Sequence, residues 1–310
     1  MAPGLCSNWQ MILRLASRRS PLALTQTREV ADRLQQLDPS IEIEIVALST
    51  RGDELNDRSL APIGGKGLFI SALEEALRNG RADAAVHSLK DVPVNLGPEF
   101  EIVALLPRGD PRDYLVGAGD LDELPAGSCV GTSSLRRQSQ ILARRPDLHV
   151  VPARGSVNSR IDLIGQGRCE AVVLSRAGLE RLGLRPAGQS LDPEAHVPAI
   201  GQGAIAVECR IETSRYRELL AALHDPDCAR STAAERAFGR GLGVDCSAPV
   251  GAWAGCRHDG MIRLLAFAGS VDGRRVHRES LSGHDPQLLG SQLAKRFHEQ
   301  GIRNYFAATP

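Results

Sequence analysis

Aromatic residues, lysine and net charge are all scarce in this chain of 310 residues. Phe, Trp and Tyr make up only 4% of it, and 37 basic side chains are balanced by 37 acidic ones. A nucleic-acid-binding surface usually carries a basic excess, and single strands need aromatic platforms, so the composition disfavours DNA or RNA as a partner. Lysine occurs only at Lys66, Lys90 and Lys295, so arginine supplies nearly all of the positive charge.

The chain also lacks the patterns of a disulfide framework, a zinc site and a membrane protein. Its seven cysteines are scattered without a C-x-x-C pair, which favours a reducing compartment. No apolar run is long enough to cross a bilayer, and residues 1–10 do not resemble a signal peptide. We therefore expect a soluble, cytoplasmic protein with no membrane partner and no bound metal.

An alternation of strands and helices predicts two α/β units of largely parallel strands, followed by a smaller α+β domain. The strands of the first unit are expected at 11–16, 41–45, 84–86 and 102–106, and its helices from Pro21 and over 68–77. The second unit is expected to hold a strand ending at Val130, strands at 148–151 and 171–174, and helices at 134–145, 157–164 and 177–182. Passages rich in proline and glycine, 107–112 and 186–203, flank the second unit.

The remaining elements complete the expected fold. A polar, glycine-rich stretch over 50–66 is expected to form a long loop, and a strand at 204–208 and a helix at 213–223 follow the second unit. The C-terminal domain is expected to contain a helix through Arg240, strands at 248–254, 262–268 and 274–280, and a helix over 286–299.

The octet from Gly131 to Gln138 (GTSSLRRQ) is the most informative segment of the chain. It reads as a strand end, a tight turn and a helix N-terminus, where free N–H groups and a partial positive charge favour anions. Thr132, Ser133 and Ser134 add hydroxyl groups, and Arg136 and Arg137 add cations suited to carboxylate or phosphate. The alternative for this octet alone is an ordinary capped helix with a solvated arginine face.

Two further turns repeat this logic, one over 16–21 with Arg18 and one over 154–160 with Arg154 and Arg160. Each could be a capped helix on its own. Three arginine-bearing turns in a neutral protein instead favour one shared polyanion site. The loop around Lys66 is not a Walker A motif, because the lysine is followed by glycine, and we interpret it as a lid that carries one cation.

Two other segments contain candidate chemical groups. A short strand ends at His87, Ser88, Lys90 and Asp91, where ligands bind in open α/β sheets. The lysine and aspartate could also form an ordinary surface pair, and a metal site is disfavoured because no third ligand lies nearby. Cys246 lies in a polar, glycine-rich loop and could act as a nucleophile, although no histidine stands beside it in the sequence.

Taken together, these segments resemble the porphobilinogen deaminase (hydroxymethylbilane synthase) family from about Leu13 to about Ile302. The matching stretches are SRRSPLAL, TRGD, GGKGLF, RADAAVHSLKDVP, DPRD, PAGSCVGTSSLRRQ, RRPDL, RG-x-V-x-x-R, AGLERLGL, PAIGQGAIAVECR and CSAPVG. The resemblance implies a transferase that joins four porphobilinogen units head to tail with loss of ammonia, then releases hydroxymethylbilane with water. It also implies two doubly wound domains like those of solute-binding proteins, 11–106 with 203–223 and 112–197, and a small α+β domain over 226–310.

The resemblance also implies roles for individual residues. Cys246 would carry the dipyrromethane cofactor through a thioether, and Asp91 would be the catalytic carboxylate, stabilising the cationic azafulvene-like electrophile left by ammonia. Further cofactor-binding residues would be Ser88, Lys90, Asp91, Thr132, Ser133, Ser134, Arg136, Arg137, Arg154 and Gly155. Substrate-binding residues would be Arg18, Ser20, Gln26, Arg154, Arg160 and Gln202, and the lid would contain Lys66 and Phe69.

Finally, the resemblance implies a cytoplasmic monomer of porphyrin and heme biosynthesis that hands its product to uroporphyrinogen-III synthase. The chain departs from some relatives at Pro62 and Ser71, where they carry lysine, and at Val244 and Asp245, where small residues are common. Asp245 is expected to raise the pKa of the neighbouring thiol. The alternative to an enzyme is a two-domain clamp for a dicarboxylate, which would have no use for Cys246.

Overall fold

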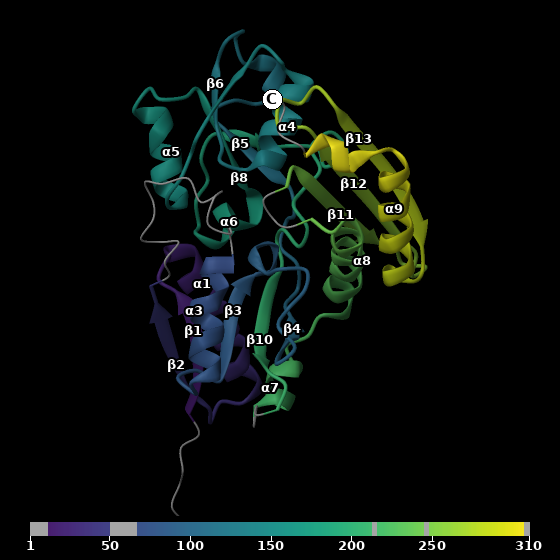
Figure 1. Ribbon diagram of the computed structural model, residues 1–310. Helices are drawn as coiled ribbons and strands as arrows, with labels where there is room; N and C mark the ends of the chain where they lie inside the picture. The colour runs from purple at the N-terminus through teal and green to yellow at the C-terminus, as the bar shows by residue number, and fades with distance from the viewer. Residues whose placement is uncertain (1–11, 50–66, 213–215, 245–247, 307–310) are drawn as a thin grey trace, which may run out of the picture.

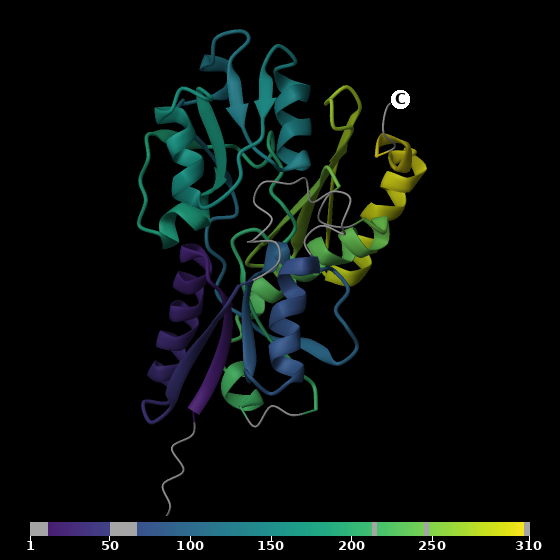
Figure 2. The same cartoon turned by 60° about the vertical axis from the view of Figure 1, so that its left-hand side comes forward.

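The computed structural model describes residues 12–49, 67–212, 216–244 and 248–306, with only the backbone of 67–71. Its strands form two five-stranded sheets and one three-stranded sheet (Figures 1 and 2). The chain is therefore a mixed α/β protein with two doubly wound sheets and a small C-terminal α+β part, which is the expected fold class.

The first sheet has the strand order β2-β1-β3-β10-β4. These strands are β1(Ile12–Arg18), β2(Glu42–Leu48), β3(Ala84–Ser88), β4(Phe100–Leu105) and β10(Ile205–Arg210), with helices α1(Pro21–Leu37), α3(Gly67–Arg78) and α7(Arg217–Ala221). Val30 and Leu34 of α1 pack on one face of the sheet, and Leu73 and Leu77 of α3 pack on the other. Ser20 caps α1 as the sequence predicted, because its side chain accepts a hydrogen bond from the Ala23 N–H at 3.3 Å.

The second sheet has the strand order β7-β6-β8-β5-β9. Its strands are β5(Asp113–Val116), β6(Cys129–Gly131), β7(His149–Val151), β8(Ala171–Ser175) and β9(Gly188–Ser190), and its helices are α4(Leu135–Arg144), α5(Val157–Gly165) and α6(Arg176–Arg181). Ile141 of α4 is buried on one face, while Leu163 of α5 and Leu179 of α6 are buried on the other. Short 3₁₀ turns η2(Leu89–Asp91) and η3(Leu121–Glu123) follow β3 and β5.

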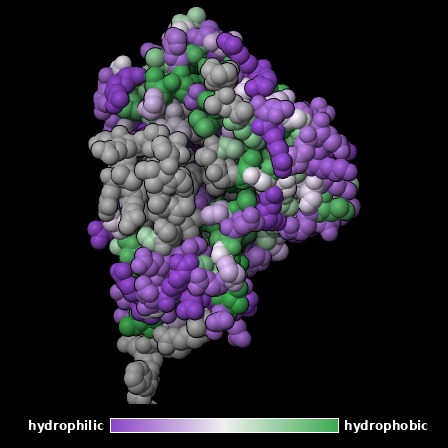
Figure 3. All heavy atoms as spheres, in the orientation of Figure 1, coloured by the Kyte–Doolittle hydropathy of each residue, from purple (hydrophilic) through white to green (hydrophobic). Residues whose placement is uncertain are grey.

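The C-terminal part is an antiparallel sheet of β11(Val250–Cys256), β12(Ile262–Gly269) and β13(Val276–Gly283), covered by α8(Pro226–Leu242) and α9(Pro286–Glu299), and it ends in the 3₁₀ turn η4(Ile302–Tyr305). Phe238 and Phe297 join the two helices edge to face, with ring centroids 4.9 Å apart. Hydrophilic residues dominate its outer surface over α9 (Figure 3). The apolar residues of the C-terminal part therefore pack between its helices and its sheet.

The structure corrects the sequence-based prediction in two places. Strands β5 and β9 were not predicted. The sheets are largely parallel, as expected, but β10 and β5 each run antiparallel to both of their neighbours. Strands β5 and β9 are short and carry no strict apolar alternation, so the periodicity of the sequence could not reveal them. The loop expected over 50–66 lies outside the described residues.

Candidate functional site

A pocket lies where β1 and β3 end beside the N-terminus of α1. It is lined by Arg18, Ser20, Leu22, Ala23, Gln26, Val86, His87, Ser88 and Asp91. Ser88 donates a hydrogen bond to Gln26 Oε1 at 2.9 Å, which joins the end of the strand to the helix. Five residues expected in a cofactor or substrate site are therefore brought together, and the half-buried Lys90 adjoins them in η2.

The turn after β7 supplies cations at the edge of the second sheet. Gly155 has a positive φ of 93°, which favours glycine, and its carbonyl accepts a hydrogen bond from Arg160 Nε at 3.0 Å. Burial lowers the pKa of Arg160 to about 10; the nearby charges of Arg137, Arg154 and Arg18 lower it too, and Asp91 raises it. The charge of Asp91 and those of arginines from both sheets therefore act on Arg160.

The octet is a strand, turn and helix start, as predicted, but its arginines are not solvated. Ser134 takes the N-cap position of α4, and Ser133 donates a hydrogen bond to the Ala153 carbonyl at 3.1 Å. Arg136 and Arg137 are only 4% and 6% exposed. The interpretation as a solvated arginine face is therefore wrong for this helix.

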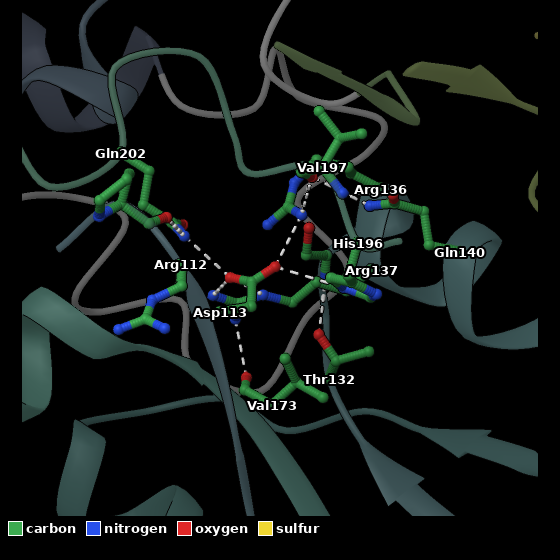
Figure 4. A network of polar contacts seen from close by, with 12 residues as sticks. Arg112, Asp113, Thr132, Arg136, Arg137, Gln140, Val173, His196, Val197 and Gln202 are labelled. Carbon is green, nitrogen blue, oxygen red and sulfur yellow. Dashed lines mark hydrogen bonds and ion pairs between the residues drawn. The ribbon is translucent and has the colours of Figure 1, made fainter. Parts of the chain in front are cut away.

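Both arginines are bound to Asp113, the fully buried first residue of β5 (Figure 4). Arg136 Nη1 donates to Asp113 Oδ2 at 2.7 Å, and Arg137 donates through Nε at 3.1 Å and Nη2 at 2.7 Å to Oδ1. Burial alone would raise the pKa of Asp113, but Arg136, Arg137 and the neighbouring His196 hold it well below its usual range. The pKa of His196 is lowered by burial and by both arginines, although Asp113 opposes this.

Gln202 also binds this carboxylate, from the segment that leads back to the first sheet. Its Nε2 donates to Asp113 Oδ1 at 2.9 Å and to the Pro111 carbonyl at 2.7 Å. Sequence reasoning missed Asp113 and His196 as parts of the site. The only signal was the DPRD stretch, which contributed to the family resemblance without a role for its second aspartate.

Several expected site residues cannot be placed. Lys66, Asp245 and Cys246 lie outside the described residues, as does Pro62, and nothing is described of the Phe69 and Ser71 side chains. The chain around Cys246 is anchored on both sides: Gly243 ends α8 with a φ of 65°, and β11 begins at Val250. A Cβ atom at Gly251 would lie 2.9 Å from Arg136 Cδ and 2.7 Å from the Pro198 carbonyl oxygen, so glycine lets β11 approach α4 closely.

The donors near the pocket suit a ligand with several carboxylates. Arg18, Ser20 and Ser88 line the pocket together with a single carboxylate, Asp91. In α4, the buried Nε atom of Arg136 has no hydrogen-bond partner among the described residues. A dipyrromethane group with acid side chains fits such a donor set. Within the described ranges, no group of three or more His, Cys, Asp or Glu residues could hold a metal, and no helix is both long and apolar enough to span a membrane.

Comparison with known proteins gives a consistent result. Residues 13–218 match the family model of the porphobilinogen deaminase dipyrromethane cofactor binding domain, and residues 229–299 match that of the porphobilinogen deaminase C-terminal domain. The chain is 44% identical over 303 residues to porphobilinogen deaminase of Methylobacillus flagellatus, covering 96% of this chain and 97% of the relative. It is 48% identical over 294 residues to the Stenotrophomonas maltophilia protein, covering 93% and 97%.

Among solved structures, the BenM effector binding domain with its effector benzoate matches at a TM-score of 0.41 and 15% identity. That match covers 70% of this chain and 96% of the BenM chain.

Proposed function

The chain belongs to the porphobilinogen deaminase family. We propose that its two five-stranded sheets contribute different groups to the family's reaction: the first supplies the catalytic carboxylate, and the second supplies most of the carboxylate-binding arginines. The protein is a transferase, a hydroxymethylbilane synthase, which condenses porphobilinogen on a dipyrromethane cofactor in tetrapyrrole biosynthesis. The observation that supports this division is the position of Asp91 in the pocket after β3, while the turn after β7 presents Arg160.

We assign the catalytic carboxylate to Asp91. Loss of ammonia from the aminomethyl group leaves a positive charge on the pyrrole, and a fixed carboxylate beside it stabilises that charge where it develops. Asp91 is suited to this role because it lines the pocket on a short 3₁₀ turn directly after β3.

We assign carboxylate binding to the arginines and hydroxyl groups. Each porphobilinogen unit carries an acetate and a propionate, so a growing chain is a polyanion that needs several two-pronged donors. Residues proposed to hold the cofactor are Ser88, Lys90, Asp91, Thr132, Ser133, Ser134, Arg136, Arg137, Arg154 and Gly155, with Cys246 as the thioether. Residues proposed to hold the substrate are Arg18, Ser20, Gln26, Arg154, Arg160 and Gln202, under a lid containing Lys66 and Phe69. When bound, the dipyrromethane group supplies the pyrrole carbon to which the first unit is added.

The domain division and the cellular context are part of the same proposal. The domains would be 11–106 with 203–223, 112–197 and 226–310, which is supported by the position of β10 between β3 and β4. We propose a cytoplasmic monomer that passes hydroxymethylbilane to uroporphyrinogen-III synthase.

Intact mass measurement of the purified protein, with peptide mapping around Cys246, tests this assignment. A surplus of two deaminated porphobilinogen units on that peptide is expected, and Cys246→Ser should abolish it. Cys256→Ser is the matched control in the same domain and should keep the surplus. If the unmodified wild-type chain still gains no mass after incubation with porphobilinogen, a dicarboxylate-binding clamp replaces the enzyme assignment.

A further inference from the structure

The buried cluster around Asp113 joins two parts of the protein that the reaction must bring together. Its carboxylate faces Arg136 and Arg137 from α4, Gln202 from the returning segment, and His196, whose Nε2 lies 3.3 Å from Oδ2. Two arginines face one aspartate, so the carboxylate balances only one of their two positive charges. Asp113 therefore orders both guanidinium groups without neutralising the pair.

Arg136 also binds the segment that precedes Gln202. Its Nη1 also donates to the Val197 carbonyl at 2.7 Å. Gln140, one turn further along α4, holds the same residue from both sides: its Nε2 donates to the Val197 carbonyl at 3.0 Å, and its Oε1 accepts from the Val197 N–H at 2.7 Å. Val197 is consequently fixed to the helix that carries the arginine pair.

The C-terminal sheet rests on this same surface. Val197 packs with Leu265 and Phe267 of β12, and the closest neighbours of a Cβ atom at Gly251 would be Val197, Pro198 and Arg136. One turn along the same face of α4, a Cβ atom at Gly269 would lie 2.3 Å from Ser139 Oγ. The strand that follows Cys246 thus begins in direct contact with the arginine whose position Asp113 sets.

We propose that Asp113 is a positioning residue for the reaction: it fixes the orientation of the Arg136–Arg137 pair and, through Arg136 and Val197, the placement of the Cys246-bearing domain on that pair. This inference rests on the proposed function, since it needs Cys246 as the attachment point and the arginines as carboxylate binders. Asp113 acts through these groups, because it is fully buried and its carboxylate is bound by Arg136, Arg137 and Gln202.

The test compares Asp113→Asn with Asp110→Asn in the full-length enzyme, with kcat expressed per cofactor-loaded molecule. Asp110 belongs to the same DPRD stretch but forms a surface pair with Arg112, so its replacement controls for a lost carboxylate in this segment. Asp113→Asn is expected to raise the KM for porphobilinogen roughly tenfold with a smaller change in kcat, because small displacements of binding groups weaken productive binding. It should also lower the fraction of protein that carries the two-pyrrole mass, at temperatures well below its Tm.

A purely structural role would lower the Tm and leave the KM and the loaded fraction of the folded protein within about twofold of wild type, and that result would overturn the proposal. If Asp113→Asn does not fold, Gln140→Met is measured instead, because it loosens Val197 without removing a charge. A KM raised severalfold supports the proposal, and an unchanged KM contradicts it. Wild-type protein that makes no tetrapyrrole from porphobilinogen would instead contradict the proposed function.

Discussion

The two five-stranded sheets have corresponding strand orders, but only the first supplies the pocket carboxylate. In both, the first three strands are parallel and the fourth is antiparallel: β2-β1-β3 with β10, and β7-β6-β8 with β5. The end of β3 leads to Asp91, whereas the turns after β6 and β7 lead to arginines. One scaffold therefore serves both sides of the site, and the residues in its strand-to-helix turns decide what each side does.

The sheets also differ in how the chain reaches the fourth strand. β5 follows directly from the first sheet, while β10 returns from the second, so two connecting segments run side by side. Gly109 N–H donates to the Gly203 carbonyl at 3.2 Å, and Gly203 has a φ of 93° with no space for a Cβ atom. Arg108 of the first segment binds the buried Glu235 of α8 at 2.6 Å. The C-terminal domain is thereby attached where the two sheets are joined.

Of the changes predicted here, Asp91→Asn should have the largest effect on turnover. It removes the pocket carboxylate of the first sheet while the arginines remain, so turnover should fall roughly 10²- to 10³-fold. The fold should be retained because Asp91 is half-buried in a short turn. Steady-state kinetics with porphobilinogen, together with the intact mass, measure both effects.

The control for this prediction lies in the 3₁₀ turn η3 beside the second sheet. Asp122 pairs with Arg144 on the surface, so Asp122→Asn removes a carboxylate from a similar turn without touching the site. Its turnover should stay at the wild-type value. Near-normal turnover of Asp91→Asn would contradict the electrostatic role of that carboxylate.

Only part of the fold of the two sheets could be predicted from the sequence. Long amphipathic helices and apolar strands were found because their periodicity is local, as in α1 and α9. The expected largely parallel arrangement is confirmed except at β5 and β10. Their reversed direction could not be predicted, because it depends on contacts between residues far apart in the chain. Nothing within the sequence of β10 says that it lies between β3 and β4.

The candidate site shows the same limit. Residues at strand ends, such as Ser88 and Asp91, could be found from the sequence because the edge of an open sheet is a general binding position. The identity of the partner of Arg136 and Arg137 could not be found, since Asp113 lies more than twenty residues earlier and only folding buries the three together. The sequence predicts which turns hold cations, but not which cations are already paired.

Raising the pH should neutralise a cation of the second edge. The pKa of Arg160 is about 10, below that of an arginine in the unfolded chain, so the native protein loses this proton first as the pH rises. The kcat/KM for porphobilinogen should therefore decline above about pH 10, to roughly a tenth once the guanidinium is neutral. Over the same pH range the free energy of unfolding rises, so the native state becomes more stable with respect to this group, because the unfolded chain retains the proton.

Arg160→Gln separates this effect from titration of the substrate's own amino group. The variant should already show roughly tenfold lower kcat/KM at pH 8. Its further decline above pH 10 should be smaller than that of the wild type. Parallel pH profiles for the two proteins would show that Arg160 is not the titrating group.

The smallest predicted effect concerns the contact between the helices of the two sheets. Arg181 of α6 binds Glu29 of α1 at 3.1 Å and donates to the Gly203 carbonyl at 3.0 Å. Arg181→Gln should lower the Tm by about 2 °C, because a single half-buried ion pair in a chain of this size contributes about 1 kcal/mol. Thermal unfolding at low and high salt measures it.

Arg33 offers a matched control because it approaches the same carboxylate, Glu29, at 3.6 Å within α1. Arg33 is 41% exposed at its side chain and Arg181 only 12%, so solvent screens the first pair more than the second. Arg33→Gln should therefore leave the Tm within the error of measurement at high salt, while Arg181→Gln still lowers it. Equal effects of the two substitutions would mean that Glu29 contributes only through α1, and that the pair between α1 and α6 does not help to hold the two sheets together.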